Sequence, residues 1–404
     1  MKDNQASKLQ SVKGIKIGVG CAGIKQHEKP DVVLFEMSEA TKTVAVFTQN
    51  AFCAAPVVIS KDHLLKQSPR YLLINSGNAN AGTGQQGFDD ALSLCQDVAK
   101  IADVSTESVL PFSTGVIGEF LPQEKMTAVI PEIFQSLSEE GWSNASNAIM
   151  TTDTVPKALS RQIDIEGELV TITGIAKGSG MICPNMATML SYVATDVAID
   201  KVLLEKCFVE VVEKTFNKIT VDGDTSTNDS CLLMATGGAD HYYFDDETSK
   251  NYVQLKMALL EVFEYLAVAI IKDGEGATKL VAIHVNNGAT KEECSSVAYT
   301  VANSPLVKTA LFAGDPNWGR ILAAVGRSGI KMFDIEKVEI DIGDIAFVRN
   351  GSVASNYTEE KGQAEFSKNE IDIYIHLGRG DASVCVWTCD FSYDYVRINA
   401  EYRT

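Results

Sequence analysis

Short apolar runs separated by glycine, proline and polar residues fill the first 80 positions of the chain. Runs of this kind are typical of β-strands. The pattern predicts strands at 15–20, 31–37, 43–50, 57–60 and 71–77. Further along the chain it predicts a strand pair around 163–173, a strand at 188–193, and strands at 280–285, 338–343, 371–378 and 383–390.

Apolar residues recur at helical spacing in other segments. These predict helices at 89–102, 121–137, 199–216 and 251–271. Strands and helices alternate loosely, and no 20–50 residue repeat or low-complexity linker divides the chain. We therefore expect an α+β fold, a layered sandwich of mixed, largely antiparallel sheets flanked by helices.

Composition and charge narrow the class of protein. The chain has 404 residues, 45% of them hydrophobic and 22% charged, which is typical of a globular protein of about two to four domains or sub-domains. Its net charge of −18 argues against a nucleic-acid partner. The polar start lacks a signal pattern, and the longest apolar run, LAVAII, is far shorter than the ~18 residues of a membrane span. We expect a cytoplasmic protein without a membrane segment.

Several common chemistries have no motif in the sequence. The nine cysteines form no C-x-x-C pair, and the five histidines have no zinc spacing, so no metal site is expected. The chain contains no P-loop, no complete G-x-G-x-x-G and no G-x-S-x-G, so neither a nucleotide cofactor nor a hydrolase triad is expected. Three acidic residues in a threonine-rich loop suggest Asx turns or caps rather than a cation site: Asp222, Asp224 and Asp229.

The segment from Lys177 to Leu190 reads KGSGMICPNMATML. By residue type alone it is a glycine-rich loop, stiffened by Pro184, that leads into a strand at Thr188. Cys183 lies within this segment, but no neighbouring histidine or motif supports it as a nucleophile.

The same segment resembles the self-cleavage motif of the ornithine acetyltransferase family of arginine biosynthesis, also called glutamate N-acetyltransferases. Other blocks that resemble the family keep its order and span nearly the whole chain. They are NSGNANAG at 75–82, PFSTGVIG at 111–118, MTTDT at 150–154, TVDGDTSTND at 220–229, DGEGATK at 273–279 and GDPNWGR at 314–320.

The resemblance implies an N-terminal-nucleophile-like acyltransferase that cuts itself between Ala187 and Thr188. The products would be an α chain, 1–187, and a β chain, 188–404, that share one core. Thr188 would then carry the acetyl group, with its freed α-amine as the base, because that amine has a pKa near ~7.7–8.0. Thr114 and Gly115 match the family's oxyanion hole.

The resemblance also implies N-acetylornithine as acetyl donor, glutamate as acceptor and no cofactor. Some family members use acetyl-CoA as a further co-substrate, and no residue here decides that question. The implied assembly is a heterotetramer of two α and two β chains. The residues that match substrate contacts are Thr151, Thr152, Lys177, Thr188, Glu275, Asn399 and Thr404.

Taken without the resemblance, the same residues have simpler interpretations. Thr114 and Gly115 form a turn after a strand, Lys177 is a solvated loop residue, and Glu275 is an exposed turn carboxylate. The terminal Thr404 is frayed. Two other functions also stay open. One is an N-terminal-nucleophile amidohydrolase or peptidase, which passes the acyl group to water. The other is a non-catalytic amino-acid-binding protein of the same fold, whose chain stays intact.

Overall fold

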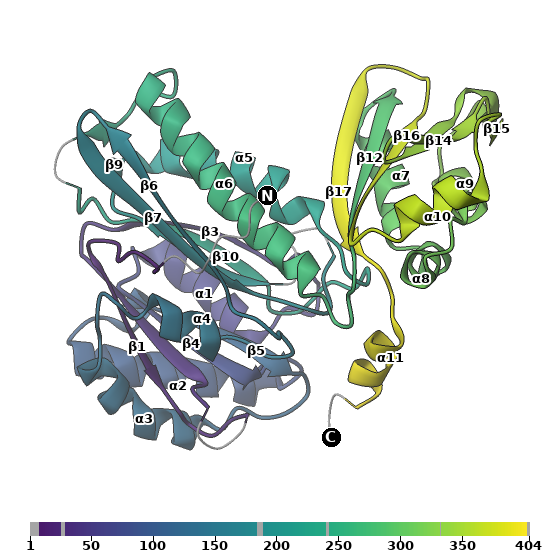
Figure 1. Cartoon of the computed structure of the whole chain (residues 1–404). Helices are drawn as coiled ribbons and strands as arrows, with labels where there is room; N and C mark the ends of the chain where they lie inside the picture. The colour runs from purple at the N-terminus through teal and green to yellow at the C-terminus, as the bar shows by residue number, and fades with distance from the viewer. Residues whose placement is uncertain (1–7, 26–28, 184–188, 240–241, 332, 402–404) are drawn as a thin grey trace. The chain divides into compact units, whose positions relative to one another are not determined.

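The computed structural model describes residues 8–25, 29–183, 189–239, 242–331 and 333–401. The chain divides into two compact units (Figure 1). The first unit comprises residues 1–178, 185–217 and 225–270, and the second comprises 179–184, 218–224 and 271–404. Each unit has its own sheets and its own hydrophobic core.

Two main sheets form the first unit. The four-stranded sheet has the order β1 (Ile15–Gly20), β2 (Val32–Met37), β4 (Tyr71–Asn78) and β5 (Val109–Val116). The five-stranded sheet has the order β3 (Lys42–Phe47), β10 (Ser230–Ala235), β8 (Leu190–Thr195), β7 (Glu168–Lys177) and β6 (Lys157–Ile165). A two-stranded parallel ribbon joins β9 (Ala198–Ile199) to β11 (Tyr243–Phe244).

Helices cover the outer faces of these two sheets, and one short helix, α4 (Trp142–Ala148), belongs to the core between them. The helices of the first unit are α1 (Ala55–Lys66), α2 (Gly84–Ala102), α3 (Gln123–Gln135), α4 (Trp142–Ala148), α5 (Lys201–Lys214) and α6 (Lys250–Lys272), with short 3₁₀ turns η1 (Thr106–Ser108) and η2 (Phe216–Lys218). One apolar cluster joins the four-stranded sheet to α2 and α3. A second cluster joins the two sheets face to face, and α6 packs over β7, where Gly174 leaves no room for a Cβ (Figure 1).

Position between layers explains the composition of the central strands. Every residue of β8 and of β10 is buried, because one face of these strands meets the other sheet and the opposite face meets helices. Strands buried on both faces are near-continuous apolar runs, as these are.

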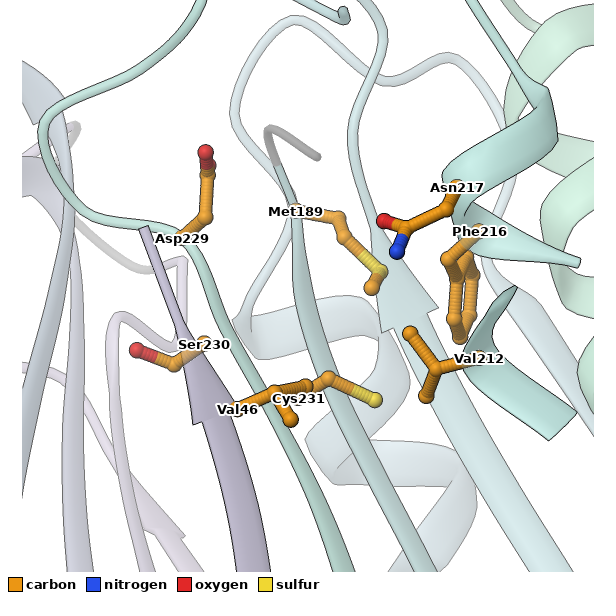
Figure 2. Close-up of a pocket in the computed structure, with 8 residues that line it drawn as sticks. All are labelled: Val46, Met189, Val212, Phe216, Asn217, Asp229, Ser230 and Cys231. Carbon is orange, nitrogen blue, oxygen red and sulfur yellow. The ribbon is translucent and has the colours of Figure 1, made fainter. Parts of the chain in front are cut away.

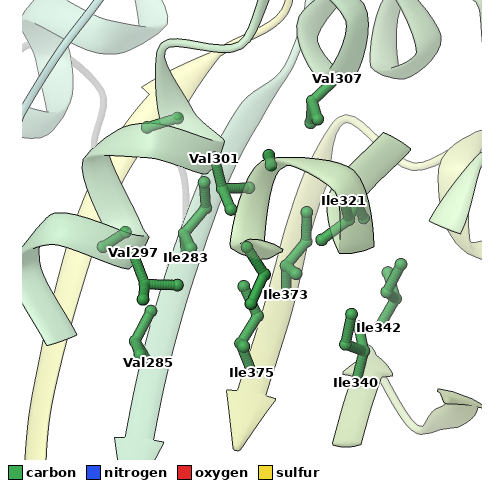
Figure 3. Packing of buried hydrophobic residues seen from close by; sticks show 14 of the residues in the cluster. Ile283, Val285, Val297, Val301, Val307, Ile321, Ile340, Ile342, Ile373 and Ile375 are labelled. Atoms are coloured by element: carbon green, nitrogen blue, oxygen red, sulfur yellow. The ribbon is translucent and has the colours of Figure 1, made fainter. Parts of the chain in front are cut away.

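The second unit is a six-stranded sheet with helices packed on one face. The strand order is β15 (Ser352–Val353), β14 (Ile345–Arg349), β13 (Glu339–Ile342), β16 (Glu370–His376), β12 (Leu280–Gly288) and β17 (Ala382–Cys389). The helices are α7 (Lys291–Ala302), α8 (Pro305–Ala313), α9 (Trp318–Gly326), α10 (Glu359–Phe366) and α11 (Tyr393–Ala400), with a 3₁₀ turn η3 (Ile335–Lys337). Alternate residues of β12 and β16 point at α7, α8 and α9 and build the core (Figure 3).

The predicted α+β class with layered mixed sheets is confirmed. Most neighbouring strands are antiparallel, while β4–β5, β8–β10, β9–β11 and β12–β16 are parallel. Among the described residues, no helix is long and apolar enough to cross a membrane.

The strand predicted at 57–60 is wrong, because these residues belong to α1. A four-residue apolar run cannot by itself distinguish a strand from a buried helical turn. Pro56 occupies the first turn of the helix, where a missing backbone N–H costs nothing. The buried face continues to His63, whose ring nitrogen Nδ1 lies 2.8 Å from the Val109 carbonyl oxygen.

Candidate active site

Thr114 and Gly115 lie within β5, so the interpretation of this pair as a turn after the strand is wrong. The pairing of β5 with β4 is irregular here, with a register shift at Gly77 and Asn78. Gly115 has φ of +137°, and a Cβ at this position would lie 2.2 Å from the Gly77 carbonyl carbon. Only glycine fits this close approach. Such bulges re-aim backbone groups and are frequent beside active sites.

Asn228 lies in the loop before β10 and forms hydrogen bonds to the irregular end of β5. Its Nδ2 donates to the carbonyl oxygens of Ala79 at 2.6 Å and Ser113 at 2.9 Å. Asn228 is itself buried and accepts a hydrogen bond from Thr227 Oγ1. The 220–229 block was noted in the sequence, but this role for its asparagine depends on contacts more than 100 residues apart and was not predicted.

Lys177 is the last residue of β7 and is only 8% exposed. The interpretation of Lys177 as a solvated loop lysine is therefore wrong. Its side chain helps to line a small pocket of about 20 Å³, which has room for one water molecule. The residues around the pocket are Thr114, Lys177, Met189, Leu190, Ser226, Asn228 and Asp229.

Asp153, which sequence reasoning missed, organises the polar groups near Lys177. Its carboxylate accepts from the Lys157 ammonium at 2.6 Å, the Gly178 N–H at 2.7 Å and the Thr151 N–H at 3.0 Å. Burial by itself would raise the pKa of Asp153, but the positive charges of Lys177 and Lys157 and these donors hold it well below its usual range. Asp153 is therefore ionised at neutral pH.

Lys25 adds a third cation to this part of the first unit. Its ammonium donates to the Met150 carbonyl oxygen at 2.8 Å and the Ala148 carbonyl oxygen at 3.2 Å. Burial lowers its pKa, with a further contribution from the charge of Lys177. Thr151 and Thr152 follow Met150 in the sequence, and both are half-buried. Which of the two threonines contacts a substrate stays undecided.

Glu275 and Asn399 contact each other within the second unit, although 124 residues separate them. Asn399 lies on α11, and its Nδ2 donates to Glu275 Oε2 at 2.8 Å. Glu275 is only 6% exposed, so the interpretation as an exposed turn carboxylate is wrong. Gly180 allows this burial, since a Cβ there would lie 2.4 Å from the Glu275 carboxylate. The resemblance had placed both residues in one substrate-contact set.

The acidic loop residues divide into two kinds. Asp222 accepts from the Asp224 N–H at 3.2 Å, so the predicted Asx turn is confirmed for it, and it also accepts from the backbone N–H groups of Met181 at 2.6 Å and Ile182 at 2.9 Å. Asp229 is buried in the first unit (Figure 2), and its carboxylate accepts from the Met189 N–H, which lies outside its own loop. Burial raises the pKa of Cys183 to about 11, which disfavours the thiolate that a nucleophile needs.

Three predicted site residues lie outside the described part of the chain: Ala187, Thr188 and Thr404. Within the described residues, no group of three or more His, Cys, Asp or Glu side chains is arranged to hold a metal ion.

An irregular strand end that shares a small pocket with a buried lysine is compatible with an enzyme that stabilises an oxyanion during acyl transfer. The ArgJ family model matches residues 16–404, so this chain belongs to the ArgJ family. The resemblance recognised in the sequence is thereby confirmed.

Named relatives match the chain along almost its full length. The arginine biosynthesis bifunctional protein ArgJ of Pseudomonas fluorescens (strain Pf0-1) is 49% identical over 396 residues, which cover 98% of each chain. The protein of the same name from Methylococcus capsulatus (strain ATCC 33009 / NCIMB 11132 / Bath) is 51% identical over 397 residues, covering 98% of this chain and 97% of the relative. The crystal structure of ornithine acetyltransferase complexed with ornithine from Mycobacterium tuberculosis is 31% identical, covers 45% of this chain and 96% of that chain, and has a TM-score of 0.41.

Proposed function

We propose that this chain is a self-processing acetyltransferase of arginine biosynthesis. It transfers acetyl from N2-acetylornithine to glutamate, giving ornithine and N-acetylglutamate. The observation that carries the proposal is the small pocket that Thr114 and Lys177, both of which match site residues of the family, line together. Membership of the ArgJ family over residues 16–404 supports the same activity.

Self-cleavage between Ala187 and Thr188 would create the working enzyme. A threonine hydroxyl is a weak nucleophile, and within an intact chain the Thr188 nitrogen is an amide that cannot act as a base. Cleavage frees the α-amine, whose reference pKa of ~7.7–8.0 suits a base at neutral pH. The amine takes the proton of Thr188 Oγ as this oxygen attacks the acetyl carbonyl. It then protonates the leaving amine of ornithine.

The Thr114–Gly115 segment is proposed to bind the oxyanions of both reactions. Attack on the Ala187 carbonyl and attack on the acetyl carbonyl each form a tetrahedral intermediate with a negatively charged oxygen. The proposed donors are the Thr114 hydroxyl and the Gly115 N–H, at the point where β5 pairs irregularly with β4 and Gly115 has φ of +137°. Fixed donors of this kind stabilise a developing charge without having to reorganise.

The two cleavage products, 1–187 and 188–404, are proposed to stay together. Strand β7 precedes the cleavage position and pairs antiparallel with β8, which follows it. Strand β3 likewise pairs with β10 from the other side of the cut. These ladders and the core between the sheets hold both fragments in one fold. We further propose that two such pairs associate as a heterotetramer.

The residues proposed to recognise the amino-acid substrates carry complementary charges. Lys177 would bind an α-carboxylate, because a buried ammonium pairs strongly with a carboxylate. Glu275, held by Asn399, would bind an amine of the substrate. Three further threonines complete the proposed contact set: Thr151, Thr152 and Thr404.

The name of the relatives suggests a second activity. Proteins 49–51% identical to this chain are called bifunctional. We propose that acetyl-CoA also donates acetyl to Thr188, so that the enzyme makes N-acetylglutamate without N-acetylornithine. No other cofactor is required by this chemistry.

Intact-mass measurement and a transfer assay test the proposal together. Purified protein should contain fragments of 187 and 217 residues, the second being 404 − 187. It should turn over N-acetylornithine repeatedly only when glutamate is present, and without glutamate the release of ornithine should stop after one equivalent per enzyme. Thr188→Ala should remain one chain and be inactive. Continued release of ornithine without glutamate would indicate a hydrolase, and an intact, inactive wild type would indicate a binding protein.

A further inference from the structure

Lys308 is a fully buried charged residue without a role in the proposed chemistry. It lies on α8, in the second unit. Among the residues that the structure describes, no carboxylate lies within ion-pair distance of its ammonium. Burial lowers the pKa of Lys308, because removing a charge from water is costly. Lysines are almost never fully buried without a paired charge, so this one requires an explanation.

The side-chain contacts of Lys308 lie where β17 ends. Its ammonium donates to Thr388 Oγ1 at 2.8 Å and to the Cys389 carbonyl oxygen, and it lies 4.5 Å from the centre of the Phe391 ring. A cation over an aromatic face is attracted by the ring. The Phe391 N–H also donates to the Lys308 carbonyl oxygen at 3.2 Å. Lys308 therefore fixes the direction in which the chain leaves the sheet towards α11 (Figure 1).

The connection between β17 and α11 is also bound to the segment 273–279. The Asp390 carboxylate accepts from the Thr278 N–H at 2.8 Å. Ser392 Oγ donates to the Gly276 carbonyl oxygen at 2.6 Å. The residue between these two anchors is the phenylalanine that the Lys308 ammonium contacts. The lysine thus completes a set of contacts that joins α8, the end of β17 and the segment 273–279.

The position of α11 follows from this connection. The Tyr395 ring stacks on the Phe391 ring, with centroids 4.4 Å apart and planes inclined by 15°. A Cβ on Gly276 would lie 2.5 Å from the Tyr395 nitrogen, so the helix lies directly on the segment 273–279. One turn later, Asn399 donates to Glu275. The amide of Asn399 therefore reaches the carboxylate only when the helix is held in this place.

We propose that Lys308 is a positioning residue for recognition of the substrate amine. By holding Phe391, it places α11 so that Asn399 can hold the carboxylate of Glu275. This inference rests on the proposed roles of Glu275 and Asn399 in substrate binding. Lys308 acts through these residues and does not touch the substrate itself, because its side chain is completely buried.

Hydrogen exchange of the purified full-length protein tests the structural step. Lys308→Met keeps a long, unbranched side chain and removes the charge. It should increase amide exchange in α11 by about 10-fold, the size expected for the loss of a buried cation–π contact and a charged hydrogen bond. The amides of β12 and β16 should keep their wild-type protection. Faster exchange in all three elements would indicate a general loss of stability and overturn the inference.

Steady-state kinetics test the functional step. Lys308→Met should raise KM for N-acetylornithine and glutamate by about 10-fold while kcat changes much less, which is the signature of lost binding. Asn399→Ala should raise KM by a similar factor. The double variant Lys308→Met/Asn399→Ala should be no worse than either single variant, because both remove the same interaction. Effects on KM that multiply would show that Lys308 does not act through Asn399.

A matched control is Arg379→Met, which removes another largely buried cation of the second unit. Arg379 pairs with Glu293, with Nε and Oε1 2.8 Å apart. Neither residue contacts α11 or the segment 273–279 through a hydrogen bond that the structure describes. Arg379→Met should therefore leave both KM and the exchange of α11 at wild-type values. A tenfold rise of KM in this control would attribute the effect of Lys308→Met to general destabilisation.

The outcomes separate this inference from the proposed function. A wild type without transfer activity overturns the proposed function, and the role of Lys308 in substrate binding with it. If the wild type is active, unchanged exchange of α11 or an unchanged KM in Lys308→Met overturns only the role of Lys308. If Lys308→Met does not fold, Phe391→Leu decides by the same two measurements, because it removes the aromatic link and alters no charge.

Discussion

Asp153 and Asp229 are two buried aspartates of the first unit, and the positive charge of Lys177 lowers the pKa of both. Their protonation states are nevertheless opposite. Asp153 has two cations and two backbone donors, which hold its pKa well below the usual range. Asp229 has a backbone donor, Met189, and the charge of Lys177 acts on it, but burial is the larger influence and raises its pKa.

The comparison shows that burial alone does not determine whether a carboxylate is ionised. A carboxylate with every lone pair satisfied is a structural anion, and moving its proton is costly. A carboxylate with one free oxygen can exchange a proton with a neighbour. Pairs of groups whose environments push their pKa values apart are a common basis for assigning acid–base roles.

The largest expected effect is on stability and concerns Asp153. Asp153→Asn leaves the fully buried Lys157 ammonium without its counter-ion, which should lower the free energy of unfolding by about 3–5 kcal/mol. Urea denaturation monitored by circular dichroism measures this. The double variant Asp153→Asn/Lys157→Met should recover much of the loss, because no unpaired charge remains. Equal losses in Asp153→Asn and Asp229→Asn would contradict the comparison.

The next effect concerns Thr114, which shares a pocket with Asp229 but not with Asp153. Thr114→Ala should slow both self-cleavage and acetyl transfer by about 10²–10³-fold, the usual cost of a lost oxyanion donor. Gel time courses and initial rates measure the two reactions. Ser113→Ala is the control, because the Ser113 hydroxyl donates to Asn75 at 2.6 Å and should not affect the chemistry. Normal rates for Thr114→Ala would remove it from the oxyanion hole.

The positive charge of Lys177 lowers the pKa of both Asp153 and Asp229, so its removal should affect the two aspartates differently. Lys177→Met should raise KM for the amino-acid substrates by about 10–100-fold, since a hydrogen bond to a charged group contributes about 1.5–3 kcal/mol. It should also raise the pKa of Asp229 further, because the charge of Lys177 holds that pKa down, and so shift the pH dependence of stability to higher pH. Steady-state kinetics and the pH profile of stability report these effects separately. An unchanged KM would argue against a carboxylate-binding role.

The smallest expected effect is on the pH dependence of stability. The depressed pKa of Asp153 stabilises the fold above the unfolded value of ~3.9, and this contribution is lost as the pH falls through the folded pKa. The raised pKa of Asp229 acts in the opposite sense, because stability falls as the pH rises from ~3.9 towards the folded pKa. Asp229→Asn should flatten this decline in thermal melts from pH 5 to pH 8. A slope as steep as that of wild type would show that Asp229 does not titrate in this range.

The sequence by itself determined the family, the α+β class and most of the long elements. These depend on local patterns, such as the apolar runs of β2 and β12 and the helical spacing of α6, and on motif blocks that keep their order. Local information failed at 57–60, where four apolar residues fit either a strand or a helix. It also supported the wrong simple interpretation of Lys177 and Glu275, because residue type does not reveal burial.

The tertiary structure decided which polar residues meet. The contact of Glu275 with Asn399 joins positions 124 residues apart, and Asn228 bonds to carbonyl oxygens of a distant strand. The opposite states of Asp153 and Asp229 depend on the cations and backbone donors that the folded chain brings to each. A carboxylate has the same chemistry everywhere in a sequence, and only its neighbours in space determine whether it holds a proton.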